Sequence, residues 1–247
     1  MQKFTTDGLV LKTKATGESD LIVFLLTEKK GIVRAFAKGA RGMKNKLHTA
    51  CVPFTYASFG LYEKNDVYNI TEADLKESFF DIRTDLSRLS LGQYFCEVVL
   101  KTITEEADEA DCYRLMLRCV YYLNQGKKDL LLIKSVFELR LAVISGYAPP
   151  VHACANCGAF STEKMYFDCE SGLLYCSECG DIQNLPEIGE AVVSAMRHIV
   201  YSPFDRLFAF TLSEQSLTTL TRMTQTYLQN CMQTRFSVLD YFWTSYS

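Results

Sequence analysis

The first part of the chain, up to residue 75, alternates short apolar runs with turn residues. The runs lie at residues 8–14, 20–27, 32–38, 52–62 and 67–73. Gly, Asn or Asp separates most of them, and this combination predicts antiparallel strands joined by short turns. Five strands in about seventy residues are typical of a small closed barrel, with an oligonucleotide/oligosaccharide-binding (OB) fold and an SH3-like barrel as the two alternatives.

The third run, IVRAFAK, differs between its two faces, because side chains alternate along a strand. The small apolar face, which suits the inside of a barrel, consists of Val33, Ala35 and Ala37. The opposite face, which combines cations with an aromatic ring, consists of Ile32, Arg34, Phe36 and Lys38. Single-stranded nucleic acid binds to such a surface through its phosphates and bases. The alternative is a solvated face with Phe36 packed under a loop.

Beyond residue 80 the apolar residues recur at helical spacing. The first such stripe consists of Leu91, Phe95, Val98 and Val99. The spacing predicts helices around this stripe, over residues 111–125 and 129–146, and near 187–200 and 214–230. The 129–146 helix is apolar on two sides, which favours a central place in a helical bundle. Gly146 is placed to cap it, and the two prolines that follow prevent its continuation.

Four of the ten cysteines form two CxxC motifs, Cys154 with Cys157 and Cys176 with Cys179. Each motif is followed by a glycine that permits a tight turn around the thiolates, namely Gly158 and Gly180. Two such motifs predict one structural Zn²⁺ per chain, because four thiolates close the coordination shell and leave no position for a catalytic water. Iron in a rubredoxin-like site, or disulfides in place of the metal, are the alternatives.

The segment between the two motifs, residues 164–176, has the pattern of a β-hairpin with Ser171 and Gly172 at its turn, as in a zinc ribbon. Cys169 lies in this segment without a CxxC partner, and His152 stands two residues before the first motif. Either residue is an alternative ligand. The other cysteines show no mutual pattern and are interpreted as buried small residues: Cys51, Cys96, Cys112, Cys119 and Cys231.

Charge is distributed unevenly along the 247 residues, although the net charge is only −3. Residues 1–50 hold ten Lys or Arg against four Asp or Glu, whereas residues 51–112 hold five against thirteen. A basic N-terminal part indicates an anionic partner. The positive charge is densest in IVRAFAKGARGMKNK, where no acidic residue interrupts Arg34, Lys38, Arg41, Lys44 and Lys46.

No catalytic motif is present in the sequence. The stretch GARGMKN fails the phosphate-loop pattern, because Lys44 stands where the second glycine is required. The acidic stretch at residues 105–111 is interpreted as a solvated linker rather than the metal site of a nuclease. No apolar run is long enough for a signal peptide or a membrane span. We therefore expect a soluble cytoplasmic protein that is not an enzyme and has no membrane partner.

Two stretches resemble RecO, a family of bacterial recombination mediators. The first is SDLIVFLLTEKKGIVRAFAKGARGMKNKLHTACVPFTYASF, with the elements LLT, G-x-V-R, A-K-G-A-R and PF. The second, FELRLAVISGYAP, directly precedes the first CxxC motif. The resemblance implies an α+β multidomain fold, with a five-stranded OB barrel followed by a helical bundle that contains an inserted zinc ribbon. The implied limits are 1–80 for the barrel, 81–150 for the helical domain, 151–183 for the ribbon and 184–247 for the helices that complete the bundle.

The resemblance also implies a nucleoid-associated protein that binds single- and double-stranded DNA and anneals complementary strands. With RecR it would help to load RecA onto strands coated by the single-stranded DNA-binding protein. Carried over by position, the residues expected to contact DNA are Arg34, Lys38, Arg41, Lys44 and Lys46, with Lys12 and Lys14 as secondary candidates. Phe36 and Tyr56 are the rings expected to stack on bases.

The family further captures the acidic tail of the single-stranded DNA-binding protein in its helical domain. Such a tail needs an apolar pocket beside a cation, which Lys134 or Arg140 would supply, unless both are ordinary exposed ends of a buried helix. A different class of function is the alternative to the mediator: an adaptor whose barrel and ribbon bind proteins, with only incidental DNA contact.

Overall fold

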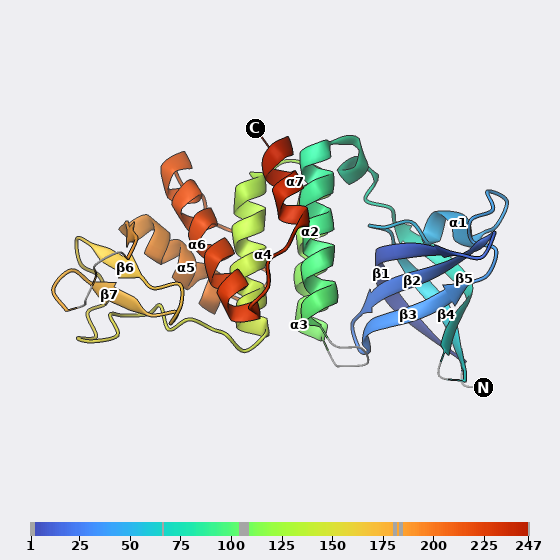
Figure 1. Ribbon diagram of the computed structural model, residues 1–247, viewed down its shortest axis with the longest axis horizontal. Helices are drawn as coiled ribbons and strands as arrows, with labels where there is room; N and C mark the ends of the chain where they lie inside the picture. The colour runs from blue at the N-terminus through green and yellow to red at the C-terminus, as the bar shows by residue number, and fades with distance from the viewer. Residues whose placement is uncertain (1–2, 66, 104–108, 180–181, 183–184, 247) are drawn as a thin grey trace. The chain divides into compact units, whose positions relative to one another are not determined.

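The computed structural model describes residues 3–246 apart from 66, 104–108, 180–181 and 183–184 (Figure 1). The chain forms two compact units, one of Met1–Lys127 with Phe236–Ser247 and the other of Lys128–Arg235. The domain limits expected at residues 80, 150 and 183 stay predictions, and residue 183 lies outside the described residues. Most of the acidic stretch at 105–111 also lies outside the described residues, since only residues 109–111 of it are described.

The first unit begins with a closed five-stranded barrel. Its strands are β1 (Lys3–Thr16), β2 (Asp20–Thr27), β3 (Gly31–Ala37), β4 (Tyr56–Lys64) and β5 (Val67–Glu77), with the short helix α1 (Leu47–Ala50) between β3 and β4. The order around the barrel is β1-β2-β3-β5-β4, and only the β3–β5 pair is parallel. This is the Greek-key order of an OB barrel, so the OB prediction is confirmed and the SH3-like alternative is not.

The barrel interior explains the alternation along β3. Val33, Ala35 and Ala37 belong to the barrel core, whereas Arg34 is exposed and Phe36 is half-buried. Ile32 departs from the expected outward face, because it is buried as well. In β1 the register shifts between Val10 and Lys12, so one extra residue interrupts the pairing with β2.

Helices follow the barrel within the same unit: the 3₁₀ turn η1 (Phe80–Thr84), α2 (Leu86–Thr102), α3 (Ala110–Gln125) and α7 (Val238–Ser245). The Asp85 carboxylate caps α2 by accepting from the backbone N–H of Arg88 at 2.9 Å. The stripe predicted from Leu91 to Val99 is buried. Helix α7, which the sequence did not predict, packs against α2, and the Ser87 hydroxyl donates to the Ser245 carbonyl at 2.7 Å.

The second unit is built around α4 (Leu130–Ile144), which packs against α5 (Glu190–Tyr201) and α6 (Glu214–Met232). The Asp129 carboxylate caps the start of α4 by accepting from the Leu131 N–H at 2.7 Å. Beyond its end, Gly146 has φ +87° and donates its N–H to the Val143 carbonyl, as the sequence predicted for a glycine cap. The central position expected for this helix follows from its apolar residues, which are buried on both sides.

A small sheet completes the second unit, with β6 (Met165–Phe167), β7 (Leu174–Cys176) and β8 (Glu187–Ile188) in the order β7-β6-β8. The β6–β7 hairpin confirms the prediction for residues 164–176. Gly172 lies in its turn with φ +73°, and a Cβ atom there would approach the Tyr227 hydroxyl oxygen to 2.9 Å. The turn therefore packs tightly against α6.

Candidate nucleic-acid interface and metal centre

Cations and rings form two rows across the outer face of β1, β2 and β3. In the first row, Phe24 pairs with Lys12 on one side and with Arg34 on the other. The second row places Ile22 between Lys14 and Phe36. Directly opposite residues in antiparallel strands have Cβ atoms about 4.5–5.5 Å apart, so each row is continuous. The Arg34 guanidinium lies 5.9 Å from the centre of the Phe24 ring.

Phe24 is the residue of this surface that sequence reasoning missed. Its signal was present, because Phe24 alternates with the buried Val23 and Leu25 in the same way as Arg34 alternates with Val33 and Ala35. We refer to the two rows, with Lys38, as the barrel face.

The loop after β3 carries the remaining predicted cations on a well-fixed backbone. Gly39 has φ +65°, and its N–H donates to the Asp20 carboxylate at 2.6 Å. Arg41 donates its N–H to the Ser19 carbonyl and its guanidinium to the Glu18 carbonyl, both at 2.9 Å. These bonds attach the loop to the turn between β1 and β2. Arg41 therefore has a structural role beside the one predicted for it.

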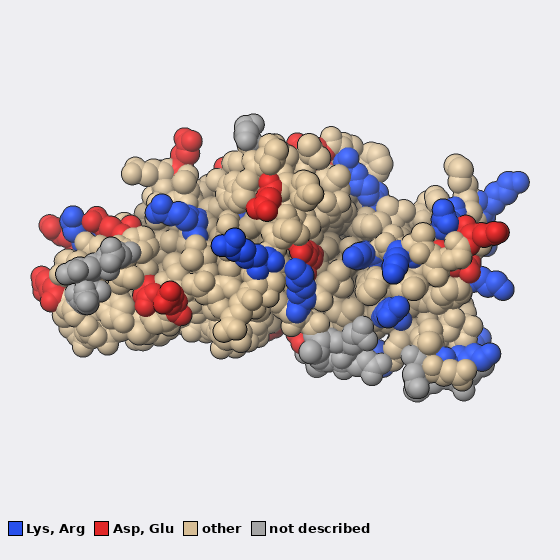
Figure 2. Space-filling model, viewed as in Figure 1, with Lys and Arg blue, Asp and Glu red and all other residues tan. Residues whose placement is uncertain are grey.

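All seven predicted cations of the barrel face and loop are exposed: Lys12, Lys14, Arg34, Lys38, Arg41, Lys44 and Lys46. None of them forms an ion pair with a residue that the structure describes. Figure 2 shows Lys and Arg side chains projecting from the barrel surface into solvent. Uncompensated exposed cations favour an anionic ligand with spaced charges.

Tyr56 does not belong to this surface as a free ring. The Lys76 ammonium lies 5.3 Å from the centre of the Tyr56 ring and forms an ion pair with Asp7 at 2.5 Å. The Tyr56 hydroxyl in turn donates to Asp7 and accepts from Tyr113, each at 3.3 Å. The hydrogen bond from Lys76 lowers the pKa of Asp7 against the opposing effect of burial. Because its hydroxyl is hydrogen-bonded and Lys76 lies over its ring, Tyr56 is tied to Asp7 and Lys76, and the rings of the barrel face are Phe24 and Phe36, both half-buried.

The two CxxC motifs meet in space beside β6 and β7. The sulfur atoms of Cys154, Cys157, Cys176 and Cys179 all lie within 4.8 Å of one another, and those of Cys157 and Cys176 are 3.7 Å apart. Zn–S bonds of about 2.3 Å in a tetrahedron place the sulfurs roughly 3.8 Å apart, so the four residues fit a metal ion. Gly158 has φ +74° and closes the first turn onto the Cys154 carbonyl at 3.0 Å.

The electrostatics of the cluster suit thiolate ligands. Burial raises the pKa of Cys154. Hydrogen bonds from the backbone N–H groups of Cys157, Cys176 and Asn156 together outweigh this effect and lower the pKa to about 6. Side-chain hydrogen bonds with Cys157 and Cys176 raise the pKa of Cys179 to about 12. Sulfurs this close together cannot all be negative unless a cation lies among them, so metal binding and deprotonation are coupled.

Comparison with known proteins identifies the family of this chain. The family model described as Recombination protein O N terminal matches residues 1–79, and the one described as Recombination protein O C terminal matches residues 83–237. The chain belongs to the RecO family. A protein of Acetivibrio thermocellus named DNA repair protein RecO is 34% identical over 242 residues, covering 98% of this chain and 96% of its own.

Two further relatives carry the name DNA repair protein RecO. That of Alkaliphilus metalliredigens is 33% identical and covers 72% of this chain and 73% of its own, and that of Clostridium perfringens is 26% identical and covers 91% of each. This chain is therefore a DNA repair protein of the RecO family. Among the described residues no helix combines the length and the apolar character that crossing a membrane requires.

The alternative metal ligands lie apart from the four sulfurs in this RecO-family structure. Cys169 directs its thiol toward the Met223 carbonyl at 3.8 Å, and burial raises its pKa to about 11. His152 is exposed, and its carbonyl accepts from the Arg197 guanidinium at 3.0 Å. Neither belongs to the group that could hold a metal. The second predicted glycine, Gly180, lies outside the described residues.

The two cations expected for a partner's acidic tail do not project freely from α4. Lys134 is fully buried and forms an ion pair with Glu138 at 2.7 Å, and its ammonium also donates to the Gln225 side chain at 3.1 Å. It is thus a core residue rather than the exposed end of a helix. Arg140 donates to the carbonyls of Ile199 and Val200 at 3.1 and 2.8 Å.

Proposed function

We propose that this RecO-family chain is a non-enzymatic recombination mediator that holds strands of DNA on the barrel face and its adjoining loop. It would bind single- and double-stranded DNA and anneal complementary strands. With RecR it would help to load RecA onto strands coated by the single-stranded DNA-binding protein. This work takes place in the cytoplasm at the nucleoid. The family's role in DNA repair supports the proposal.

The observation that carries it is the pair of rows, in which Phe24 lies between Lys12 and Arg34, and Ile22 lies between Lys14 and Phe36. The cations lack carboxylate partners among the described residues, so phosphates can replace their counterions without first breaking an ion pair. Each base stacked on a ring contributes about 1–3 kcal/mol. Phe24 and Phe36 lie on neighbouring strands and would receive bases of the same DNA strand.

Annealing needs no chemical step in this account. Neutralising the phosphates of two strands reduces their mutual repulsion, and holding both strands on one surface raises their local concentration. Nucleotide hydrolysis is therefore not required. Annealing by the purified protein only in the presence of ATP would contradict this part of the proposal.

We also propose that the metal is Zn²⁺, one per chain, with a structural role. Four cysteine sulfurs provide closed coordination, which leaves no open position for a substrate or water. When bound, the ion would fix the ribbon by joining the loop before β6 to the end of β7. Capture of the acidic partner tail by the helices stays a proposal, in which Lys134 would not contribute because its ammonium is buried.

The decisive test is fluorescence anisotropy of a labelled single-stranded oligonucleotide across a salt series. The variant Lys38→Glu/Lys44→Glu leaves the structural contacts of Arg41 intact. The control Lys29→Glu/Lys64→Glu changes charge equally at two exposed positions, one in the turn after β2 and one at the last residue of β4. With about five phosphates neutralised, log K should fall against log salt with a slope near −3.5.

We expect the Lys38→Glu/Lys44→Glu variant to bind weakly, with a slope shallower by at least about 1.4, because two phosphate contacts of about 0.7 each are lost. The control should bind like the wild type. Equal binding by all three proteins, or binding by none, would show that the barrel face and its loop are not the DNA-binding site. The adaptor function would then be the better account.

A further inference from the structure

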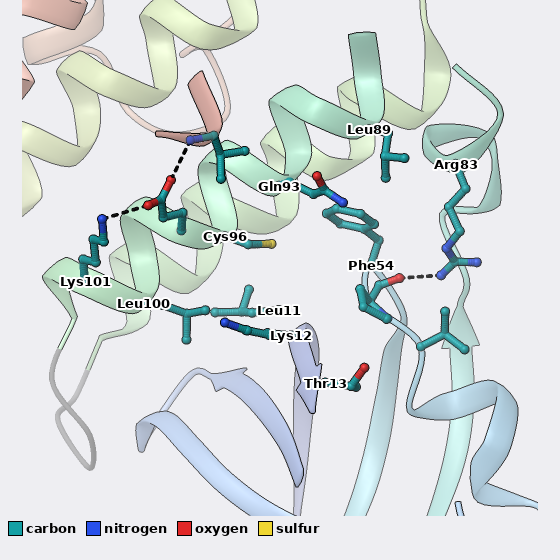
Figure 3. A pocket seen from close by; sticks show the side chains of 14 residues that line it. Leu11, Lys12, Thr13, Phe54, Arg83, Leu89, Gln93, Cys96, Leu100 and Lys101 are labelled. Carbon is teal, nitrogen blue, oxygen red and sulfur yellow. Dashed lines mark hydrogen bonds and ion pairs between the residues drawn. The ribbon is translucent and has the colours of Figure 1, made fainter. Parts of the chain in front are cut away.

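A groove of about 690 Å³ adjoins the barrel face within the first unit. Figure 3 shows Leu11, Lys12 and Thr13 of β1 on one side and Leu89, Gln93, Cys96 and Leu100 of α2 on the other. Its volume lies within the range of roughly 300–1,000 Å³ that small-molecule pockets occupy. The walls are mainly apolar, so the groove suits a flat hydrophobic group rather than an extended polar one.

The groove has a built wall at Phe54. This residue has φ +64°, a left-handed backbone that non-glycine residues rarely adopt. The Phe54 N–H donates to the Val10 carbonyl at 2.9 Å, and the Val10 N–H donates to the carbonyl of the next residue, Thr55, also at 2.9 Å. On α2, a Cβ atom at Gly92 would lie only 3.0 Å from the Phe54 ring. The ring is thus fixed against the helix, and backbone strain of this kind concentrates at binding sites.

The polar groups of the groove divide into occupied and free ones. Both carboxylate oxygens of Glu97 are occupied, one by Lys101 at 2.7 Å and the other by the Val238 N–H at 3.3 Å. The Arg83 guanidinium donates to the Pro53 carbonyl at 2.5 Å. By contrast, the exposed Gln93 amide forms no hydrogen bond with a described residue. A free amide above apolar walls can pair with the edge of a nucleobase.

We infer that this groove receives an unstacked nucleobase of the DNA strand bound on the barrel face, with Gln93 at the base edge and Lys12 at the adjoining phosphate. This inference rests on the proposed DNA-binding function. The observation that selects a nucleic acid is continuity, because Lys12 lines the groove and also begins the row through Phe24 to Arg34. With Lys12, Lys101 and Arg83 against Glu97, the charge around the groove is also positive.

The test has two independent parts: protein variants change the groove, and an abasic residue in the oligonucleotide removes the base that the groove would hold. Leu100→Trp introduces a bulky ring into the groove, and Gln93→Ala removes the free amide at an exposed position where folding is not at stake. Leu86→Trp is the matched control, because Leu86 is exposed on the same helix and does not line the groove. The probe is a labelled single-stranded oligonucleotide, intact or with one abasic residue placed at successive positions.

We expect Leu100→Trp to weaken binding of the intact oligonucleotide by about 5-fold or more, because one base loses its contacts with the groove. The salt slope should not change, because the phosphate contacts remain. Gln93→Ala should weaken it by a smaller factor, and Leu86→Trp should not. One abasic position should weaken binding to the wild type by a similar factor, and should cost the Leu100→Trp protein nothing further.

Wild-type affinity in Leu100→Trp and Gln93→Ala, with the same abasic profile, would overturn the inference while leaving the barrel face as the DNA site. The groove would then be open to an apolar segment of a protein partner. If the wild type failed to bind the oligonucleotide at any salt concentration, the proposed function would fail, and this inference with it.

Discussion

Phe24 offers the sharpest single test of the barrel face, because it lies between two cations, Lys12 and Arg34, and is itself uncharged. Replacing it with Ala should remove one stacking platform, worth about 1–3 kcal/mol, and so weaken binding of single-stranded DNA by about 5- to 150-fold. Lys12 and Arg34 would remain, so the number of phosphate contacts, and with it the salt slope, should not change. Phe24→Leu keeps apolar area without a ring, and most of the loss should persist.

The same replacement has a stability cost that must be measured beside the affinity. Phe24 has one cross-strand neighbour on each side, and each such pair contributes roughly 0.2–1 kcal/mol. The variant should thus lose at most about 2 kcal/mol of the free energy of unfolding, which a closed barrel tolerates. Urea unfolding followed by circular dichroism measures this loss, and fluorescence anisotropy across salt measures binding.

Phe80→Ala is the matched control, because Phe80 is an exposed phenylalanine outside the barrel face. It should bind DNA like the wild type. Full affinity in Phe24→Ala would refute the reasoning, since a base would then not stack on this ring. A shallower salt slope in Phe24→Ala would refute it differently, by showing that the replacement displaced the cations.

Three further predictions address the scaffold. Replacing Cys157 with Ser should reduce bound zinc from about one per chain to almost none in mass spectrometry of the purified protein, because three thiolates do not close the site. Gly172→Ala should cost about 2–4 kcal/mol of unfolding free energy in urea, and Gly146→Ala only about 1–2 kcal/mol, because both have positive φ but only the first meets another side chain. Equal costs would contradict the described packing. In carbon-13 NMR, the pKa of Asp7 should lie below its ordinary 3.8 in the wild type and rise in Lys76→Met, where the hydrogen bond that lowers it is absent.

The strands, the main helices and the cysteine cluster were predictable because their signals are local. Alternation along β3 follows from the backbone of that strand alone, and the CxxC spacing follows from the geometry of one turn. The turn at Gly172 was marked by a residue that the left-handed backbone requires. In each case, a few adjacent residues hold the information.

Features that depend on partners distant in sequence could not be predicted. Helix α7 is short, and its packing on α2 supplies the contacts that stabilise it. Helical spacing places Glu138 one turn after Lys134 on α4, but it gives no sign of Gln225 on α6, which accepts the second hydrogen bond of the buried ammonium. Tyr56 was expected to meet DNA, whereas Lys76, from another strand, covers its ring.

The extra residue in β1, between Val10 and Lys12, determines which side chains reach the barrel face and which line the groove. Val10 faces the barrel core, so strict alternation would point Leu11 outward and Lys12 inward. The register shift between Val10 and Lys12 reverses this, because a bulge adds one residue and changes the face of every side chain beyond it. Lys12 and Lys14 therefore join Arg34 and Phe36 on the outer face, while Leu11 is buried and lines the groove. The cations of β1 reach the barrel face for a reason that lies in the pairing of β1 with β2, which the hydrophobic pattern of β1 does not show.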